Sequence, residues 1–247
     1  SGIASSTPWT PMLKLSNLIT DSIVDGPGIR ATVFCQGCPH HCEGCHNPET
    51  WCATGGELYS VDTVIKKLER FKPYFERSGG GVTFSGGEPL LQPDFLLELF
   101  SRCKEEGIHT CLDTAGFGDP ARFPAILEKT DLVLYDVKAL SAEGYLAMTG
   151  KGIAVTEAFQ DALRQSGKPA VVRQVVIPGI SDSEEYMLSL QQYIKTNIPT
   201  AQRVELLPYH KAGIHKYTAL GLSDPLCHVP QMDKEETRRL QATYFDD

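Results

Sequence analysis

Short apolar runs alternate with longer amphipathic segments along most of the chain. The apolar runs are strand-sized and rich in β-branched and aromatic residues, and they predict six strands at 30–34, 81–85, 108–113, 132–138, 170–177 and 203–207. Helix-like segments lie between and after these runs, and several begin near a capping residue or a proline, as at Ser60 and Pro93. Alternating strands and helices of this kind are typical of a parallel sheet covered by helices.

The length of the chain limits how many such units it can form. A complete eight-stranded barrel needs about 250 residues, whereas this chain has 247 and its first predicted core strand begins only at residue 30. We therefore predict an α/β fold: a partial (β/α)6 TIM-like barrel with its active site at the carboxyl ends of the strands. No change in composition divides residues 1–247, so we expect one domain, with residues 1–29 as an N-terminal extension.

Composition narrows the class of partner. The net charge of -8 argues against nucleic acid, because binding to phosphates depends on excess Lys and Arg. The longest apolar runs are too short to cross a membrane, and the first residues lack the charged and apolar regions of a signal peptide. These features predict a cytoplasmic protein, and thiols in that compartment stay reduced.

Four of the eight cysteines are crowded into one loop after the first predicted strand. A structural zinc site usually separates its two Cys-x2-Cys pairs by twelve or more residues, but here only three residues separate them. Close spacing on one loop is typical of iron-sulfur ligands. We therefore predict that the loop carrying Cys35, Cys38, Cys42 and Cys45 binds an iron-sulfur cluster, although Cys35, at the end of "TVFC", could equally be a small buried packing residue.

Further polar residues follow the next strands. In "SGGEP", Gly86 and Gly87 permit close backbone approach and Glu88 offers an acceptor for an ammonium group, although the motif alone is equally an ordinary strand-to-helix turn. Asp136 and Lys138 are two residues apart and share one face of a strand, either as a structural ion pair or as ligands of a charged cofactor.

Four more residues stand out on or just after the third, fifth and sixth predicted strands. Asp113 ends the third predicted strand, close to the two charged residues of the fourth. Arg173 lies among apolar neighbours, where a guanidinium needs an anionic partner. Tyr209 and His210 end the sixth strand, at the predicted rim of the barrel.

The spacing Cys38-x3-Cys42-x2-Cys45 resembles the signature of the radical S-adenosylmethionine superfamily. The resemblance implies that three thiolates hold a 4Fe-4S cluster and that the fourth iron chelates S-adenosyl-L-methionine, which one electron then cleaves. It also implies a set of cofactor contacts: Gly86, Gly87, Glu88, Asp113, Lys138, Arg173, His210 and Asn47. The family has an aromatic residue immediately before the third cysteine, where this chain has Gly44.

Longer motifs resemble the activating enzymes of glycyl radical enzymes, especially those that act on pyruvate formate-lyase. They are "DGPGIR", "CHNPETW", "SGGGVTFSGGEPLLQ", "GIHTCLDTAG" and "ELLPYH". The resemblance implies a glycyl radical enzyme of the pyruvate formate-lyase type as protein substrate, with Asp25 and His46 holding its glycine loop. It implies reduced flavodoxin or ferredoxin as electron donor and a monomeric enzyme. The ferredoxin-like insertion of some relatives is absent, since only Cys52 lies in that interval.

The same resemblance implies a monovalent cation, Na or K, beside the cofactor. Its ligands would be Asp113, Thr114, Asp136 and the backbone carbonyl of Leu134. The "DTNG" of the family is "DTAG" here, so the amide side chain is replaced by Ala115. The remaining thiols, Cys52, Cys103, Cys111 and Cys227, are predicted to be packing residues.

Two alternatives remain open at this point. A radical enzyme acting on a small molecule shares the cysteine loop and "GGE" with the activating enzymes. A noncatalytic zinc or iron-sulfur binding module also fits the cysteines alone, and it would not cleave S-adenosyl-L-methionine.

Overall fold

The computed structural model describes residues 12–246 and contains one continuous eight-stranded sheet, in the order β3-β1-β2-β4-β5-β6-β7-β8. The strands are β1 (Met12–Ser22), β2 (Arg30–Cys35), β3 (Glu57–Ser60), β4 (Gly81–Gly86), β5 (His109–Thr114), β6 (Leu132–Val137), β7 (Ala170–Val176) and β8 (Ala201–Pro208). From β2 to β8 all neighbouring strands are parallel, whereas β1 pairs antiparallel with both β2 and β3. The six predicted strands and the partial barrel are confirmed.

The start of the sheet differs from the prediction. The first core strand was predicted to begin at residue 30, but β1 lies within the predicted extension, and its Leu13 and Leu15 are buried in the core. Only part of β1 alternates between buried and exposed positions, and it lies next to the edge strand β3. The alternation of apolar and polar residues that marks a strand in a sequence is therefore weak in β1. Residues 1–11 lie outside the described part of the chain.

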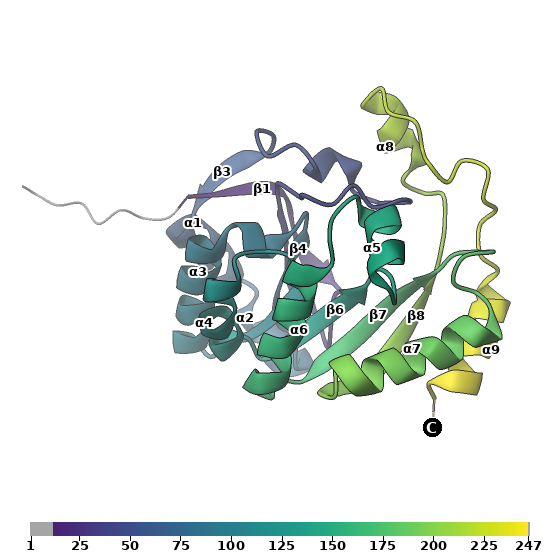
Figure 1. Cartoon of the computed structure of the whole chain (residues 1–247). Coiled ribbons are helices and arrows are strands. Elements are labelled where there is room, and N and C mark those ends of the chain that lie inside the picture. Colours follow the sequence, from purple (N-terminus) through teal and green to yellow (C-terminus); the bar gives the residue numbers. More distant parts are fainter. Residues whose placement is uncertain (1–11, 247) are drawn as a thin grey trace, which may run out of the picture.

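Helices cover one face of the sheet and contact one another in the order α1, α3, α4, α6, α7, α9 (Figure 1). The α-helices are α1 (Val61–Glu69), α2 (Lys72–Ser78), α3 (Pro93–Glu105), α4 (Phe123–Lys129), α5 (Ala142–Thr149), α6 (Ala154–Ser166), α7 (Glu184–Asn197), α8 (Ile214–Ala219) and α9 (Lys234–Tyr244). Short 3-10 turns are η1 (Pro48–Thr50), η2 (Pro89–Leu91) and η3 (Pro120–Arg122). In the described residues, no helix has the length and apolar character needed to cross a membrane.

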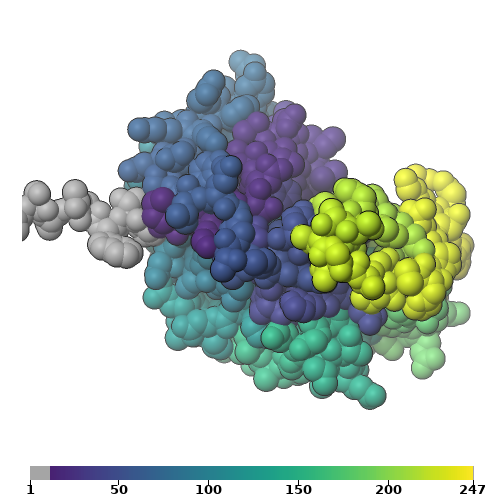
Figure 2. Space-filling model, turned by 90° about the horizontal axis from the view of Figure 1, so that it is seen from above, coloured from purple at the N-terminus to yellow at the C-terminus, as the bar shows by residue number. Residues whose placement is uncertain are grey.

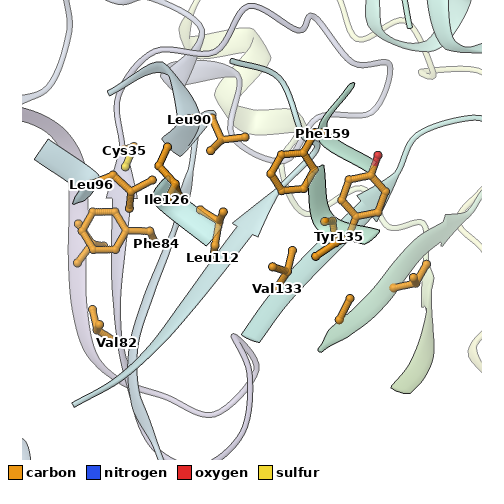
Figure 3. Close-up of a cluster of buried hydrophobic side chains, with 14 of the residues drawn as sticks. Cys35, Val82, Phe84, Leu90, Leu96, Leu112, Ile126, Val133, Tyr135 and Phe159 are labelled. Carbon is orange, nitrogen blue, oxygen red and sulfur yellow. The ribbon is translucent and has the colours of Figure 1, made fainter. Parts of the chain in front are cut away.

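The two faces of the sheet have different chemistry, because successive residues of a strand point to opposite sides. On the helix side, residues such as Val33, Phe84 and Leu112 pack against the helices in one large core (Figure 3). The other side is the inside of the barrel. Its deeper layer is a small apolar cluster of Cys111, Leu132, Leu134 and Val171. The next residues with the same orientation are charged, and they face the open end of the barrel.

Candidate active site

A cavity of about 760 Å³ opens at the carboxyl ends of the parallel strands. Almost all of the predicted site residues line it: Cys38, Cys42, Cys45, His46, Asn47, Gly86, Gly87, Glu88, Asp113, Thr114, Asp136, Lys138, Arg173 and His210. Leu134 and Asp25 do not line it. The fold therefore brings together segments that are far apart in the sequence, as expected where parallel strands end at one edge.

The cysteine loop leaves β2 and presents three thiols to this cavity. Cys38, Cys42 and Cys45 are partly exposed, whereas Cys35 is buried with Val33 in the helix-side core (Figure 3). Cys35 therefore packs in the core and points away from the other three. Burial raises the pKa of Cys42 to about 11, so a bound iron would take the place of its proton.

The arrangement of donors suits a cluster better than a single ion. Among residues 12–246, no three His, Cys, Asp or Glu side chains are grouped so that they could hold one metal ion together. A 4Fe-4S cluster does not need that convergence, because each thiolate binds a different iron. The backbone N–H of Asn47 points to the sulfur of Cys45 at 3.4 Å, which is the kind of donor that stabilises cluster sulfur. The residues present fit the cluster.

Helix α5 supports one side of the cysteine loop. The carbonyl oxygens of Met148 and Thr149 at its C-terminus accept hydrogen bonds from the backbone N–H of Glu43 (2.9 Å) and of His41 (3.0 Å). A further hydrogen bond of 3.1 Å joins the Tyr145 hydroxyl to Nε2 of His40. His40 is buried and burial lowers its pKa to about 4, so the ring is neutral and acts as a packing residue beside the loop.

Helix α8 supports the opposite side of the same loop, and Figure 2 shows its segment lying against the residues that follow β2. The Tyr217 hydroxyl donates to the backbone carbonyl of Cys45 at 3.0 Å. The Lys216 ammonium donates to Oδ1 of Asn47 at 3.0 Å and pairs with Glu49 at 2.5 Å. The loop is therefore held between α5 and α8, two helices that were not predicted from the sequence.

The "GGE" turn holds the start of the cysteine loop by backbone contact. Gly87 N–H donates to the carbonyl of Cys35 (2.8 Å), and Glu88 N–H donates to that of Gly37 (2.9 Å). A Cβ atom on Gly87 would lie 2.2 Å from the Gly37 oxygen, and one on Gly86, whose φ is +99°, would lie 2.5 Å from the Cys35 nitrogen. Only glycine fits at both positions.

Glu88 is fully buried and both of its carboxylate oxygens have donors on the same chain. Oε1 accepts from the hydroxyl of Thr114 at 2.5 Å and from Leu90 N–H at 3.2 Å, and Oε2 accepts from Ala115 N–H at 3.1 Å. Burial nevertheless raises the pKa of Glu88 to about 7. In the structure this carboxylate links the ends of β4 and β5, and it borders the cavity where an ammonium was predicted.

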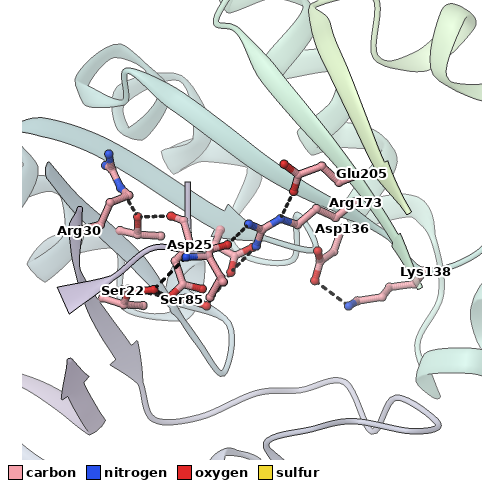
Figure 4. Close-up of polar contacts among 12 residues, drawn as sticks. Ser22, Asp25, Arg30, Ser85, Asp136, Lys138, Arg173 and Glu205 are labelled. Carbon is pink, nitrogen blue, oxygen red and sulfur yellow. Dashed lines mark hydrogen bonds and ion pairs between the residues drawn. The ribbon is translucent and has the colours of Figure 1, made fainter. Parts of the chain in front are cut away.

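A charged layer lies above the apolar floor of the barrel (Figure 4). Lys138 donates to Asp136 at 2.8 Å, which confirms that these two residues share a face of β6. The Arg173 guanidinium donates to Glu205 (3.1 Å) and forms a longer ion pair with Asp113 (3.7 Å). Burial, and secondly Asp136, raises the pKa of Asp113 above its ordinary value. Two carboxylates thus approach each other beside the cavity.

Asp25 and Leu134 lie below this layer. The Asp25 carboxylate accepts hydrogen bonds from the hydroxyls of Ser22 (2.5 Å) and Thr32 (2.8 Å), and its backbone oxygen accepts from Thr83 (Figure 4). The side chain of Leu134 belongs to the apolar floor. In the structure Asp25 therefore fixes the turn between β1 and β2.

The part of the rim formed by the cysteine loop and the end of β8 is aromatic. The rings of His46 and His210 stack with centroids 4.1 Å apart. Gly44 has a φ of +72°, and a Cβ there would lie 2.9 Å from Leu226 and 3.0 Å from the Tyr209 ring. Tyr209 and Leu226 thus fill the space beside Gly44.

Some residues of the site were missed or assigned wrongly. Cys103 and Cys111 are buried as predicted, but the prediction that Cys52 and Cys227 pack inside is wrong, since both are exposed. Tyr145 and Tyr217 were missed because they act through hydroxyl groups on helices far away in the sequence. No local pattern marks such contacts.

Comparisons with known proteins agree with this site. The family described as "4Fe-4S single cluster domain" matches residues 24–140, which include the cysteine loop. The chain is 47% identical to the pyruvate formate-lyase-activating enzyme of Clostridium pasteurianum, over 93% of this chain and 96% of that one. It is 40% identical to the enzyme of that name from Listeria monocytogenes, over 90% and 92% of the two chains.

Solved structures show the same fold. A radical SAM methyltransferase from Sphaerobacter thermophilus aligns with a TM-score of 0.60 at 16% identity, over 94% of this chain and 74% of that one. A domain of the pyruvate-formate lyase-activating enzyme from Bacteroides vulgatus aligns with a TM-score of 0.52 at 23% identity, over 66% and 92%.

This partial barrel, with the three-cysteine loop at its open end, has the fold of a solved radical S-adenosylmethionine enzyme. The chain belongs to the family of pyruvate formate-lyase-activating enzymes, as its identity with curated members over most of their length shows.

Proposed function

We propose that this enzyme activates a glycyl radical enzyme of the pyruvate formate-lyase type. The strongest support is that three thiols on one loop, held between α5 and α8, face the cavity. The chain that carries them is 47% identical to a pyruvate formate-lyase-activating enzyme. The cluster, when bound, supplies one electron that cleaves S-adenosyl-L-methionine into methionine and a 5'-deoxyadenosyl radical, which takes the α hydrogen of a glycine in the partner.

The residues of this chain have distinct tasks in that reaction. Cys38, Cys42 and Cys45 hold three irons. Lys138 offers an ammonium to the methionine carboxylate, and it stays charged because, although burial opposes the charge, Asp136 raises its pKa above the ordinary value. Gly87 lets the β4 turn approach the cysteine loop closely enough for both to border one cavity.

Other cofactor contacts are proposed from the lining of the cavity. Glu88 and Gly86 would face the amino group, Arg173 and Asp113 the methionine end, and Asn47 with His210 the nucleoside end. Both oxygens of Glu88 already have donors, so an ammonium would join an existing network rather than fill an empty acceptor.

We further propose a monovalent cation beside this end of the cofactor. Asp113 and Asp136 are near neighbours on adjacent strands, and a cation would offset the repulsion that contributes to the raised pKa of Asp113. Thr114 and the Leu134 carbonyl would complete the set. Cleavage of S-adenosyl-L-methionine in Na⁺ or K⁺ should then exceed cleavage in a large organic cation at equal ionic strength. Equal rates would contradict the cation site.

The protein substrate and the electron donor are proposed from the same family. His46 at the rim, and Asp25 in the turn below it, would contact the glycine loop, and reduced flavodoxin or ferredoxin would supply the electron. We expect a monomer with one radical S-adenosylmethionine domain spanning residues 1–247, without a ferredoxin-like insertion. All eight cysteines are free, which favours a reducing cytoplasm.

The test uses pyruvate formate-lyase as the partner. The reconstituted, reduced enzyme is mixed anaerobically with S-adenosyl-L-methionine and the partner, and the glycyl radical is observed by electron paramagnetic resonance. A doublet that collapses when the partner carries α-deuterated glycine supports the proposal. Cleavage of S-adenosyl-L-methionine without any radical on the partner would favour a small-molecule substrate instead.

A further inference from the structure

Glu205 is a charged residue on the edge strand β8, next to the charged layer of the barrel. In the pairing of β7 with β8 it lies directly opposite Arg173, and side chains at such cross-strand positions contact each other. Its Oε2 accepts a hydrogen bond from Nε of Arg173 at 3.1 Å (Figure 4). Glu205 itself does not line the cavity, whereas Arg173 does. Any contact with a molecule in the cavity is therefore made by the arginine.

The guanidinium of Arg173 has five N–H donors, and the protein uses only some of them. Nε donates to Glu205, and Nη2 donates to the backbone carbonyl of Val24 at 2.7 Å. Within residues 12–246, Nη1 has no hydrogen-bond acceptor, and its ion pair with Oδ2 of Asp113 is long, at 3.7 Å. That oxygen already accepts the Ser85 hydroxyl at 2.6 Å. Nη1 therefore keeps its two N–H groups for an anion in the cavity.

Two contacts are enough to set the direction of this group. A guanidinium is planar and rigid, so fixing two of its nitrogens also fixes the third. Here Glu205 holds Nε from β8, and the carbonyl of Val24 holds Nη2 from the turn between β1 and β2. The Arg173 side chain is only 10% exposed, so water offers few competing acceptors.

We propose that Glu205 is a positioning residue, which holds Arg173 so that its Nη1 meets the carboxylate of S-adenosyl-L-methionine. The inference rests on the proposed function, which assigns Arg173 to the methionine end of the cofactor. Without Glu205, the guanidinium is held only by the carbonyl of Val24 and can turn toward Asp113. The arginine would then still be present but would bind the cofactor less tightly.

The test compares Glu205→Ala with Glu205→Gln, whose amide oxygen can still accept from Nε. Both should fold, because the Glu205 side chain is 27% exposed. Binding of S-adenosyl-L-methionine to the reconstituted enzyme is measured by equilibrium dialysis, with the cluster left oxidised so that no cleavage occurs. We expect the Kd to rise about tenfold in Glu205→Ala and about twofold in Glu205→Gln. In the reduced enzyme KM should rise by the same factors while kcat stays unchanged, because the carboxylate contact is the same before and during cleavage.

A double-mutant cycle shows whether Glu205 acts through the arginine. In an Arg173→Ala background, Glu205→Ala should cause no further loss of affinity. The matched control is Arg203→Ala, which removes the exposed partner of the other Glu205 oxygen and should change the Kd by less than about twofold. In the metal-free protein, the Nε–H of Arg173 should give a slowly exchanging nuclear magnetic resonance signal that is lost in Glu205→Ala.

Three results would overturn the inference. They are an unchanged Kd in Glu205→Ala, an equal loss of affinity with and without Arg173, and an Nε–H signal that still exchanges slowly in Glu205→Ala. Failure of the wild-type enzyme, with a full cluster, to bind S-adenosyl-L-methionine is a different result, because it would contradict the proposed function itself.

Discussion

At the scale of single residues, Glu88 has the most unusual environment in the described site. It is a fully buried carboxylate with three donors, and burial still raises its pKa to about 7. Its donors lie at the ends of β4 and β5, so its hydrogen bonds hold the two strand ends together beside the cavity. The family resemblance, rather than the motif alone, marked Glu88 as a cofactor ligand, and its internal donors could not be predicted because Thr114 and Ala115 lie at the end of a different strand.

A pH dependence of stability follows from this environment. The pKa of Glu88 in the folded protein lies above its ordinary value of 4.5, so its contribution is full below about pH 4.5 and declines as the pH rises through about 7. Glu88→Gln cannot ionise. The unfolding free energy of wild type minus that of Glu88→Gln, from urea denaturation of the metal-free proteins, should therefore decrease between pH 4.5 and pH 7. A difference that is constant or increases would contradict the assignment.

The chemistry of other residues could be predicted to different degrees. The family signature that Cys38, Cys42 and Cys45 resemble separated them from Cys35, and the structure places all three beside the cavity. Spacing was not enough for Cys52 and Cys227, since exposure depends on how the whole chain packs. The sequence also gave no partner on this chain for Arg173, although its guanidinium pairs with both Glu205 and Asp113 in the structure.

At the scale of elements, the cysteine loop depends on α5 and α8 rather than on its own hydrogen bonds. Neither helix was predicted. Helix α5 is eight residues long and lacks a clear apolar stripe, and α8 is only six residues long, so periodicity gives no signal in either. The helices α1 and α3 were predicted because a capping residue, Ser60, or a proline, Pro93, marks where each begins.

The support that α5 gives to the cysteine loop can be tested by removing one hydroxyl group, that of Tyr145. Tyr145→Phe removes the buried hydroxyl partner of His40 Nε2 and leaves the Thr156 hydroxyl with only its longer bond to the carbonyl of Ala115. It should lower the unfolding free energy by about 1 to 2 kcal/mol. It should also reduce the iron retained after gel filtration, because the loop is then held less firmly. Leu146→Ala changes an exposed residue of the same helix and should have little effect. Full iron retention in Tyr145→Phe would show that α5 does not position the loop.

At the scale of the whole molecule, the barrel is incomplete and one arginine bridges its two sides. Among the described residues, the two edge strands of the sheet, β3 and β8, do not pair with each other, so the barrel stays open. Arg173 on β7 donates to the carbonyl of Val24, in the turn between β1 and β2, at 2.7 Å. The partial barrel was predictable from the number of strands, but this bridge was not, because it joins residues 149 positions apart.

This bridge gives a prediction on the stability of the turn. Arg173→Lys cannot bond Glu205, Asp113 and Val24 at once, and leaves largely buried carboxylates poorly paired, so we expect a loss of about 3 kcal/mol. The turn at residues 22–28 should become more sensitive to limited proteolysis. The control Arg203→Lys changes an exposed partner of the same Glu205 and should cost less than about 1 kcal/mol. Equal proteolysis of both variants would contradict a bridging role.

The central claim is that three thiolates of one loop hold a cluster that cleaves S-adenosyl-L-methionine. The most direct measurement is 5'-deoxyadenosine formed by the reconstituted, reduced enzyme under anaerobic conditions, in wild type, Cys35→Ala and Cys42→Ala. The account predicts product in wild type and in Cys35→Ala, whose thiol lies in the core, and none in Cys42→Ala. Product that survives the loss of Cys42, or its absence from wild type with a full cluster, would contradict the account.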